Sequence, residues 1–387
     1  MPDFEGPLTL GPARLESIVA LANRVFRGAK GDMGREYPLL FRPDRMEQLR
    51  VITCEDKPVS LVGCIINDVT LLGCPLRICS VGSVCTDDAA RGQGLAGRLV
   101  DDAVERSAAA GASVMLISGG RSLYVRRGAY SVGQFSRYSI PVSQLPAPVG
   151  LSVSDLTVDD VPALMKLMEG EPIRYRLVED EYVTIIRLGR LYDQKARLFS
   201  VERDGRPLAS IAVTLPKKID PAKPAPPTAV VRHVAGVRAV LPEALKLIAP
   251  MLEAEQIDVE GYASDVELAS VMSRASSAAR PIGFVSGTIK LLNPQRLWND
   301  FLPLLQERIG APAGEIKLSW QADELKVHTL KFELAGQSLE IRGDQEVMAT
   351  MFGSSKLDPL GQASGPLATL LRKALPLPTV LYGLNYV

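Results

Sequence analysis

This chain of 387 residues has few histidines and few aromatic residues, and it has no net charge. It contains 2 histidines and 5% aromatic residues, and its 44 basic residues balance 44 acidic ones. The histidines, His233 and His328, lie far apart in the sequence, which argues against a Ser-His-Asp hydrolase and against a histidine-rich zinc site. A chain without net charge also lacks the basic character that favours phosphates, so we expect no nucleic-acid partner.

Long apolar runs are missing as well. No run reaches the roughly 20 residues that cross a bilayer, and the N-terminus lacks the basic-then-apolar order of a secretory signal. We therefore expect a cytoplasmic protein with no membrane partner. A chain of this length is too long for one ordinary core and predicts two or three domains.

The cysteines lack the spacing of a metal or redox site. All five fall in one N-terminal stretch, none forms a Cys-x-x-Cys pair, and an odd count fits a disulfide framework poorly. In apolar, strand-like sequence a free cysteine behaves as a small hydrophobe. We expect buried structural thiols and no metal, with a metal or redox site as the alternative. The five are Cys54, Cys64, Cys74, Cys79 and Cys85.

The first part of the chain predicts an α/β or α+β domain at 1–148. Several strands precede the first crossover helix, and Pro146 and Pro148 mark a linker after the last strand of the domain. Helical patterns cover 12–29, 42–49, 92–110 and 122–126. Strand patterns cover 50–54, 59–66, 69–79, 80–86, 113–117 and 133–140.

The order of elements over 80–140 returns over 229–292, which predicts a duplicated second domain at 149–292. Its helices are expected at 158–168, 242–255 and 265–275, and its strands at 198–203, 207–214, 229–235, 257–262 and 283–292. A third, α+β domain is expected at 293–387. It has helices at 295–309, 344–352 and 364–374 and strands at 315–320, 325–333 and 337–342. Its apolar tail, 375–387, is expected to be tucked into the protein, because solvated termini are usually polar.

The sharpest local motif is a glycine-rich loop that opens a helix. It follows the strand at 81–86 and reads Arg91-Gly92-Gln93-Gly94-Leu95-Ala96-Gly97. The free N–H groups of a first helical turn converge on one point, the helix dipole adds positive charge, and glycine lets an anion approach the backbone. The loop therefore predicts a pyrophosphate site, with Arg91 and Arg98 adding charge-assisted hydrogen bonds.

Three other interpretations compete for this loop. Residues 92–97 also match the Gly-x-Gly-x-x-Gly fingerprint of dinucleotide folds, but five residues separate them from the strand and no ribose-binding acid follows. A Walker A loop is excluded because no Gly-Lys-Ser/Thr follows. A purely structural loop remains an alternative.

Two motifs together resemble the Gcn5-related N-acetyltransferase (GNAT) superfamily. Arg91-x-x-Gly94-x-Ala96 fits its Arg/Gln-x-x-Gly-x-Gly/Ala motif, and Leu123-Tyr124-x-x-x-Gly128-Ala129-Tyr130 resembles its second motif. The resemblance implies acetyl-CoA as co-substrate and Tyr124 as the acid that protonates the departing thiolate. A packed aromatic residue is the alternative reading of Tyr124.

The same resemblance implies which residues hold acetyl-CoA. Backbone groups of Val84, Cys85 and Thr86 would pair with the pantetheine arm, and the amides of Gly92 to Gly97 would hold the pyrophosphate. Gly119 and Gly120 would lie beside the thioester.

The layout of the whole chain resembles the enhanced-intracellular-survival (Eis) family. That family has two GNAT-like mixed-sheet domains in tandem, followed by a sterol-carrier-like α+β domain. Its terminal carboxylate enters the active site of the first domain and acts as the base, a role that falls here to Val387. The usual terminal residue of the family is aromatic, so valine is a departure.

The resemblance implies an N-acetyltransferase that acts by direct attack on a primary amine of an aminoglycoside- or polyamine-like small molecule. It also implies a closed homo-oligomer, often a hexamer. The second domain lacks a phosphate-binding loop at 235–243 and is expected to bind no coenzyme A. An acidic cluster in that domain would attract a cation or form a solvated face. Its members are Glu171, Glu179, Asp180 and Glu181.

Two other functions remain open. A non-catalytic protein that binds coenzyme A or a lipid would share the same loop, although it would need neither Tyr124 nor an apolar terminus. A protein acetyltransferase that modifies lysine or N-termini would share the whole site, and only its acceptor would differ.

Overall fold

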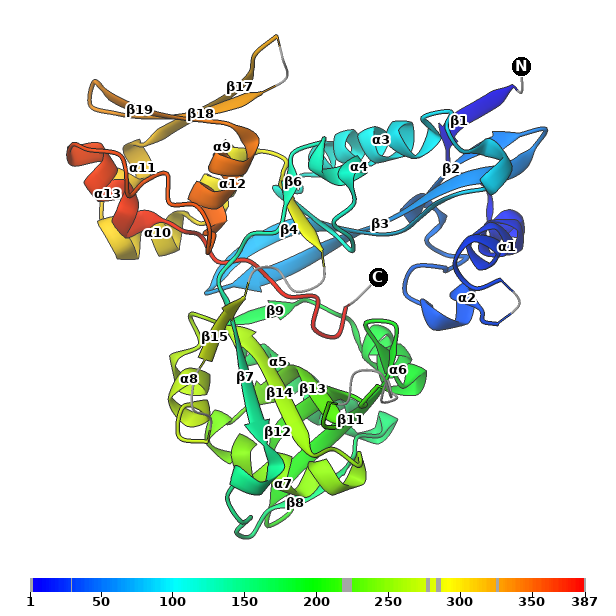
Figure 1. The fold of residues 1–387 in the computed structure, drawn as a ribbon, viewed down its shortest axis with the longest axis vertical. Coiled ribbons are helices and arrows are strands. Elements are labelled where there is room, and N and C mark those ends of the chain that lie inside the picture. Colours follow the sequence, from blue (N-terminus) through cyan, green and yellow to red (C-terminus); the bar gives the residue numbers. More distant parts are fainter. Residues whose placement is uncertain are drawn as a thin grey trace. The chain divides into compact units, whose positions relative to one another are not determined.

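A computed structural model describes residues 3–28, 30–217, 225–275, 279–282, 287–324 and 327–385. These residues form two compact units (Figure 1). The first unit comprises 3–133 and 287–379, and the second comprises 134–282 and 380–385. The chain is a mixed α/β protein, as the sequence predicts.

A mixed sheet forms the centre of the first unit. Its strand order is β1-β2-β3-β4-β5-β16-β6, and β4 and β5 form its parallel pair. The strands are β1 (Phe4–Leu8), β2 (Leu49–Cys54), β3 (Lys57–Leu71), β4 (Cys74–Thr86), β5 (Val114–Ile117), β6 (Ala129–Tyr130) and β16 (Thr288–Leu291).

Helices α3 and α1 cover the two faces of this sheet (Figure 1). In α3 (Leu95–Ala109) the apolar positions Leu95, Leu99 and Ala103 recur at helical spacing and pack into the core with Cys79 of β4. The other helices of this part are α1 (Leu15–Phe26), α2 (Met33–Glu36) and α4 (Ser122–Val125). Four of the five cysteines are buried and Cys54 is half-buried, all as free thiols, so the expected burial is confirmed for all but Cys54.

Two long strands, β3 and β4, replace the three shorter ones expected at 59–66, 69–79 and 80–86. The expected strands at 59–66 and 69–79 leave Asn67 and Asp68 between them, but both residues lie inside β3. The Asn67 amide donates to Ser80 Oγ at 3.1 Å, and Asp68 pairs with Arg77 at 2.9 Å on β4. Cross-strand partners thus keep polar residues in a strand where their intrinsic preference is for a turn. The helix expected at 42–49 is a single 3-10 turn, Met46–Gln48, because β2 begins at Leu49.

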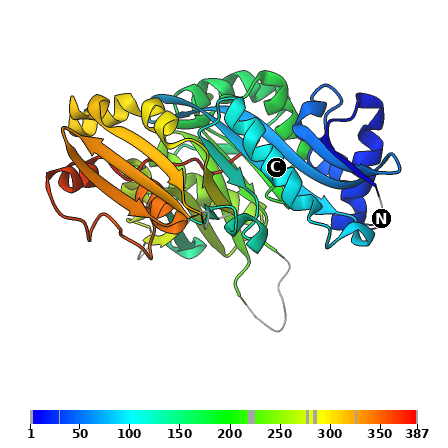
Figure 2. The same cartoon turned by 90° about the horizontal axis from the view of Figure 1, so that it is seen from above.

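The C-terminal part of the first unit packs three strands against short helices. The antiparallel strands β17 (Lys317–Ala322), β18 (His328–Leu334) and β19 (Gln337–Arg342) lie side by side in Figure 2. The helix expected at 295–309 is divided at Phe301, because Pro303 begins a new helix. The helices are α9 (Pro294–Asp300), α10 (Leu302–Ile309), α11 (Pro312–Glu315), α12 (Asp344–Phe352) and α13 (Pro366–Ala374).

The second unit has a sheet of its own, with the order β10-β11-β12-β13-β14-β7-β15 and with β8 paired to β11. Its strands are β7 (Phe135–Pro141), β8 (Ser152–Asp155), β10 (Arg190–Leu191), β11 (Gln194–Arg203), β12 (Arg206–Thr214), β13 (Thr228–Gly236), β14 (Gln256–Tyr262) and β15 (Ala279–Ile282), and a further short strand is β9 (Ile173–Tyr175). Its helices are α5 (Val161–Glu169), α6 (Glu179–Leu188), α7 (Leu241–Met251) and α8 (Val266–Met272).

Two strands each join the sheet of the other unit and not the one expected from their place in the sequence. The strand expected at 133–140 to complete the first sheet is β7, which pairs with β14 and β15. The described part of the strand expected at 283–292 is β16, which pairs with β5 and β6. Alternating apolar residues predict a strand but do not specify its partner. The compact units are therefore interleaved in sequence, whereas the domains 1–148, 149–292 and 293–387 are contiguous segments and stay a prediction.

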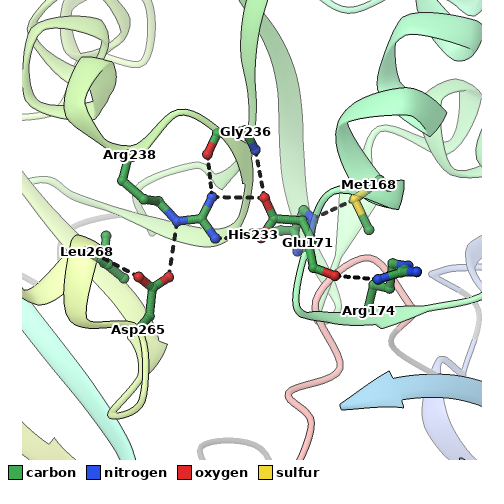
Figure 3. Close-up of polar contacts among 8 residues, drawn as sticks. All are labelled: Met168, Glu171, Arg174, His233, Gly236, Arg238, Asp265 and Leu268. Carbon is green, nitrogen blue, oxygen red and sulfur yellow. Dashed lines mark hydrogen bonds and ion pairs between the residues drawn. The ribbon is translucent and has the colours of Figure 1, made fainter. Parts of the chain in front are cut away.

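A buried ion network stabilises the second unit (Figure 3). The Arg238 guanidinium donates to both carboxylate oxygens of Glu171, at 3.0 and 2.5 Å, and to Asp265 at 3.0 Å. The Gly236 N–H donates to the same Glu171 carboxylate at 2.7 Å. The side chains of Arg238 and Glu171 are only 10% and 8% exposed. The expected acidic cluster therefore does not include Glu171, while Glu179 and Asp180 are exposed at the start of α6.

Removing one member of this network leaves a buried charge without its partner. We expect Glu171→Ala to lower the free energy of unfolding by about 3–5 kcal/mol, measured by urea denaturation of the full chain. The matched control is Asp155→Ala, which breaks the more exposed Arg197–Asp155 pair of the same unit and should cost at most about 1 kcal/mol. Equal losses in the two variants would contradict the structural role of Glu171.

Candidate functional site

Strands β4 and β5 form a fork in the first unit. They pair in parallel from Ile78 with Val114 to Val81 with Ile117, where β5 ends. β4 continues for five more residues to Thr86 and pairs there only with β3 in the described part of the sheet. The segment 82–86 therefore presents one edge of its backbone, and an unpaired edge is a template for an extended ligand.

A β-bulge shapes this edge. Leu61 of β3 pairs with Cys85, but Gly63 pairs with Gly82, so β4 has one more residue than β3 between these two pairs. Ser83 has φ 52°, in the left-handed region that a residue with a side chain rarely adopts. Bulges of this kind bend a strand and re-aim its groups next to active sites. Here the bulge directly precedes Val84, Cys85 and Thr86.

The glycine loop follows β4 and ends at the start of α3. Gly92 and Gly94 have φ 79° and 73°, and apart from their own chain neighbours the described residues place no atom within 4 Å of the position that a Cβ would take on either. Gly94 is the N-cap and offers no side chain to the first turn of the helix. The N–H groups of that first turn have no acceptor within the helix, so the loop leaves both donors and space for an anion.

A cavity of about 730 Å³ joins the fork to the loop. This volume lies in the usual range for small-molecule sites, about 300–1,000 Å³. It is lined by residues of all three expected groups: the strand edge for the pantetheine arm, the glycine loop for the pyrophosphate, and the expected acid Tyr124. The expected residues that line it are Val84, Cys85, Thr86, Arg91, Gly92, Gly94, Leu95, Ala96, Gly97 and Tyr124.

Some expected residues do not line the cavity. Gln93 is exposed, and Gly119 and Gly120 lie outside the lining, although a Cβ on Gly119 would be 3.2 Å from the Tyr124 ring. Arg98 donates to the Gly6 carbonyl oxygen instead of facing the loop. Arg91 remains beside the loop, where it pairs with Asp88 at 2.6 Å.

The cavity lining also contains residues that were not predicted from the sequence. α1 contributes Val25 and Phe26 as an apolar wall, a position that only the packing of α1 reveals. Three arginines beside the second motif add positive charge around the cavity, and their clustering near Tyr124 is a signal that sequence reasoning could have used. They are Arg121, Arg126 and Arg127.

Tyr124 is positioned by the short helix α4. Its side chain reaches the cavity, yet the residue is only 6% exposed. Burial raises the pKa of Tyr124, an effect that the nearby Arg121 guanidinium opposes. The phenol is therefore protonated at neutral pH and is able to donate a proton to a leaving group.

Cys85 is the one thiol in the cavity lining. Burial raises its pKa to about 12, and the positive charges of Arg24 and Arg91 partly oppose this shift. A thiol is a nucleophile only as the thiolate. Cys85 is therefore protonated at neutral pH and is not a nucleophile there.

The lining contains no aspartate, glutamate or histidine among the described residues. In that same part of the chain, no group of three or more His, Cys, Asp or Glu side chains is placed to hold a metal ion. No described helix is long and apolar enough to cross a membrane. The predicted base, Val387, lies outside the described residues.

The second unit contains a similar fork without a similar cradle. β13 and β14 pair in parallel from Thr228 with Gln256 to Val231 with Val259 and then separate. At the end of β13, the Gly236 N–H is directed at the carboxylate of Glu171 (Figure 3). A side-chain anion of this chain thus accepts an N–H at the end of β13, on the strand that corresponds to β4 of the first unit.

Comparison with known proteins agrees with this geometry. Residues 9–133 match the family model of the acetyltransferase (GNAT) domain. No curated protein sequence matches the chain. Several solved structures share its fold over the full length.

Three of these structures illustrate the likeness. A GCN5-related N-acetyltransferase from Kribbella flavida is 14% identical, with a TM-score of 0.63 and 100% of both chains covered. One from Anabaena variabilis ATCC 29413 is 12% identical, with a TM-score of 0.63 and 98% of both chains covered. Eis1 from Mycobacterium abscessus is 12% identical, with a TM-score of 0.60 and 100% of both chains covered.

At these low identities the structural likeness shows the fold alone, whereas the family match identifies residues 9–133 as the acetyltransferase domain. It covers α1, the fork, the glycine loop and Tyr124. Residues 9–133 therefore form an acetyltransferase domain of the GNAT type.

Proposed function

We propose that the chain transfers the acetyl group of acetyl-CoA directly to a primary amine of a small, aminoglycoside- or polyamine-like molecule. One observation supports the donor most strongly: a single cavity combines the bulged strand edge, the open glycine loop and a buried tyrosine. The acceptor class rests on the resemblance to the Eis family in motifs and layout.

Each part of the cavity has a role in this reaction. The edge at Val84–Thr86 binds the pantetheine arm as an added strand, and the first turn of α3 binds the pyrophosphate. Acetyl-CoA supplies the thioester. The amine nitrogen bonds to the acetyl carbon and loses a proton to a base, while the C–S bond breaks and Tyr124 protonates the sulfur.

We assign the base to the α-carboxylate of Val387. Two observations support this assignment. The described lining of the cavity offers no carboxylate or imidazole, and the tail that leads to Val387 is buried up to Asn385. A free carboxylate two residues beyond Asn385 would supply the missing acceptor of the amine proton.

We also propose the layout of the Eis family, with GNAT-like domains at 1–148 and 149–292 and a sterol-carrier-like domain at 293–387. The parallel fork of β13 and β14, and the helices around β17–β19, support it. Assembly into a closed homo-oligomer and a cytoplasmic location stay predictions.

Tyr124→Phe removes the proposed acid with little change in shape. We expect kcat to fall by about 100-fold or more, the lower end of general acid catalysis, with little change in the KM for acetyl-CoA. The measurement is thiol release with a panel of primary amines. Tyr182→Phe is the matched control, a buried tyrosine outside the cavity lining, and should keep kcat within a few-fold of wild type. No detectable thiol release from the wild type with any amine would favour the non-catalytic coenzyme A-binding alternative.

The same variant has a pH signature. An acid works only while it is protonated, so activity is lost as the pH rises through its pKa. Because burial raises the pKa of Tyr124, the alkaline limb of kcat should lie above about pH 10, the ordinary value of a tyrosine. This limb should be absent from the Phe variant. A limb near neutral pH that persists in both proteins would argue against Tyr124 as the acid.

Deleting Tyr386 and Val387 moves the terminal carboxylate back along the chain. We expect kcat to fall by about 100-fold or more while the Kd of acetyl-CoA, measured by calorimetry, is unchanged. Val387→Ala is the control, because it keeps the α-carboxylate in place and should remain active. Full turnover by the shortened chain would refute the assignment of the base.

A further inference from the structure

The terminal segment lies in the fork of the second unit. Beyond Val231 and Val259, β13 stays paired with β12 and β14 stays paired with β7, but the two strands no longer pair with each other. The Leu381 N–H donates to the phenol oxygen of Tyr262, at the end of β14, at 3.2 Å. Gly383 lies against His233 of β13, since a Cβ there would be 3.3 Å from Nδ1.

A second phenol holds the same segment two residues further on. The Gly383 N–H donates to the hydroxyl oxygen of Tyr192 at 2.9 Å. The fully buried ring of Tyr382 packs edge-on against the Tyr192 ring, with centroids 6.4 Å apart. The Asn385 N–H closes a turn onto the Tyr382 carbonyl at 2.8 Å. The tail is thus fixed through its main chain at alternate residues.

The conformation of Tyr192 carries an energetic cost. Tyr192 and Asp193 form the two-residue turn between β10 and β11, with φ 53° and 61°. Positive φ at both positions is the geometry of a type I′ hairpin, which prefers Asn-Gly. A bulky residue in that position is strained. This turn conformation brings the Tyr192 phenol to the tail, and the packing of Tyr192 against other groups offsets the strain.

Charged groups on the two diverging strands support this arrangement. The Arg232 guanidinium lies over the Tyr192 ring, 4.6 Å from its centroid, and donates to Glu260 at 2.8 Å. Burial raises the pKa of both Tyr192 and Tyr262, so each phenol is neutral. Burial also lowers the pKa of His233 to about 4, so the ring beside Gly383 carries no charge at pH 7.

We propose that Tyr192 and Tyr262 are positioning residues of the acetyl transfer. Their phenol oxygens hold the main chain of Gly383 and Leu381 and so fix the segment that carries the Val387 carboxylate. This inference rests on the proposed function, because it assumes that the terminal carboxylate is the base. A base displaced by about 1 Å loses much of its effect, so the clamp would act on kcat and not on acetyl-CoA binding.

The test compares Tyr192→Phe, Tyr262→Phe and the double variant with wild type in the full chain. Tyr182→Phe is the matched control, a buried tyrosine of α6 in the same unit. The first readout is the rate at which carboxypeptidase Y releases the last residues under native conditions. Each lost hydrogen bond should raise this rate about fivefold. Gly383→Ala tests the contact from the tail side and should raise it as well.

The second readout is the kcat for an amine that the wild type acetylates. We expect kcat to fall in the two clamp variants and most in the double variant, with the KM for acetyl-CoA within twofold of wild type. In a chain that ends at Asn385, the same substitutions should have no further effect on the remaining rate, because the clamp acts only through the missing residues.

Two results would overturn the proposal. Unchanged release by carboxypeptidase in the double variant would show that the phenols do not hold the tail. Faster release with unchanged kcat would show that the docked tail has no part in catalysis. Failure of the proposed base is seen separately, as full kcat in the chain that ends at Asn385.

Discussion

Parallel pairing between β4 and β5 ends after four residues, and the site of the first unit depends on that early separation. If β5 continued, its backbone would occupy the edge of β4 at 82–86 and leave no room for an extended ligand. The bulge at Ser83 and the glycines before α3 add direction and access to this edge. Tyr124 and the arginines around it then close the cavity from the side of α4.

The second unit shows what happens when a similar fork is filled by the chain itself. Glu171 accepts the Gly236 N–H and the Arg238 guanidinium, and residues 380–385 lie between the diverging strands. Groups of the protein itself thus make contacts at both strands of this fork. The fold alone therefore does not determine function, because the same strand arrangement offers a ligand site in one unit and holds the tail in the other.

Most elements and the core of the site could be predicted from the sequence, because they depend on local patterns. The loop at Arg91–Gly97 and the motif at Tyr124 combine glycine, charge and a helix start within a few residues. What failed depends on partners distant in sequence. Asn67 and Asp68 stay in a strand through cross-strand contacts, β7 and β16 join sheets that their own segments do not specify, and Val25 and Phe26 reach the cavity only through the packing of α1.

In the proposed function only the first unit binds acetyl-CoA. Isothermal titration of the full chain tests it most directly, with Gly94→Ala as a variant that strains the loop at φ 73°. We expect one site per chain in the wild type and a large loss of affinity in the variant. Two sites per chain, or affinity in the variant equal to that of the wild type, would contradict it.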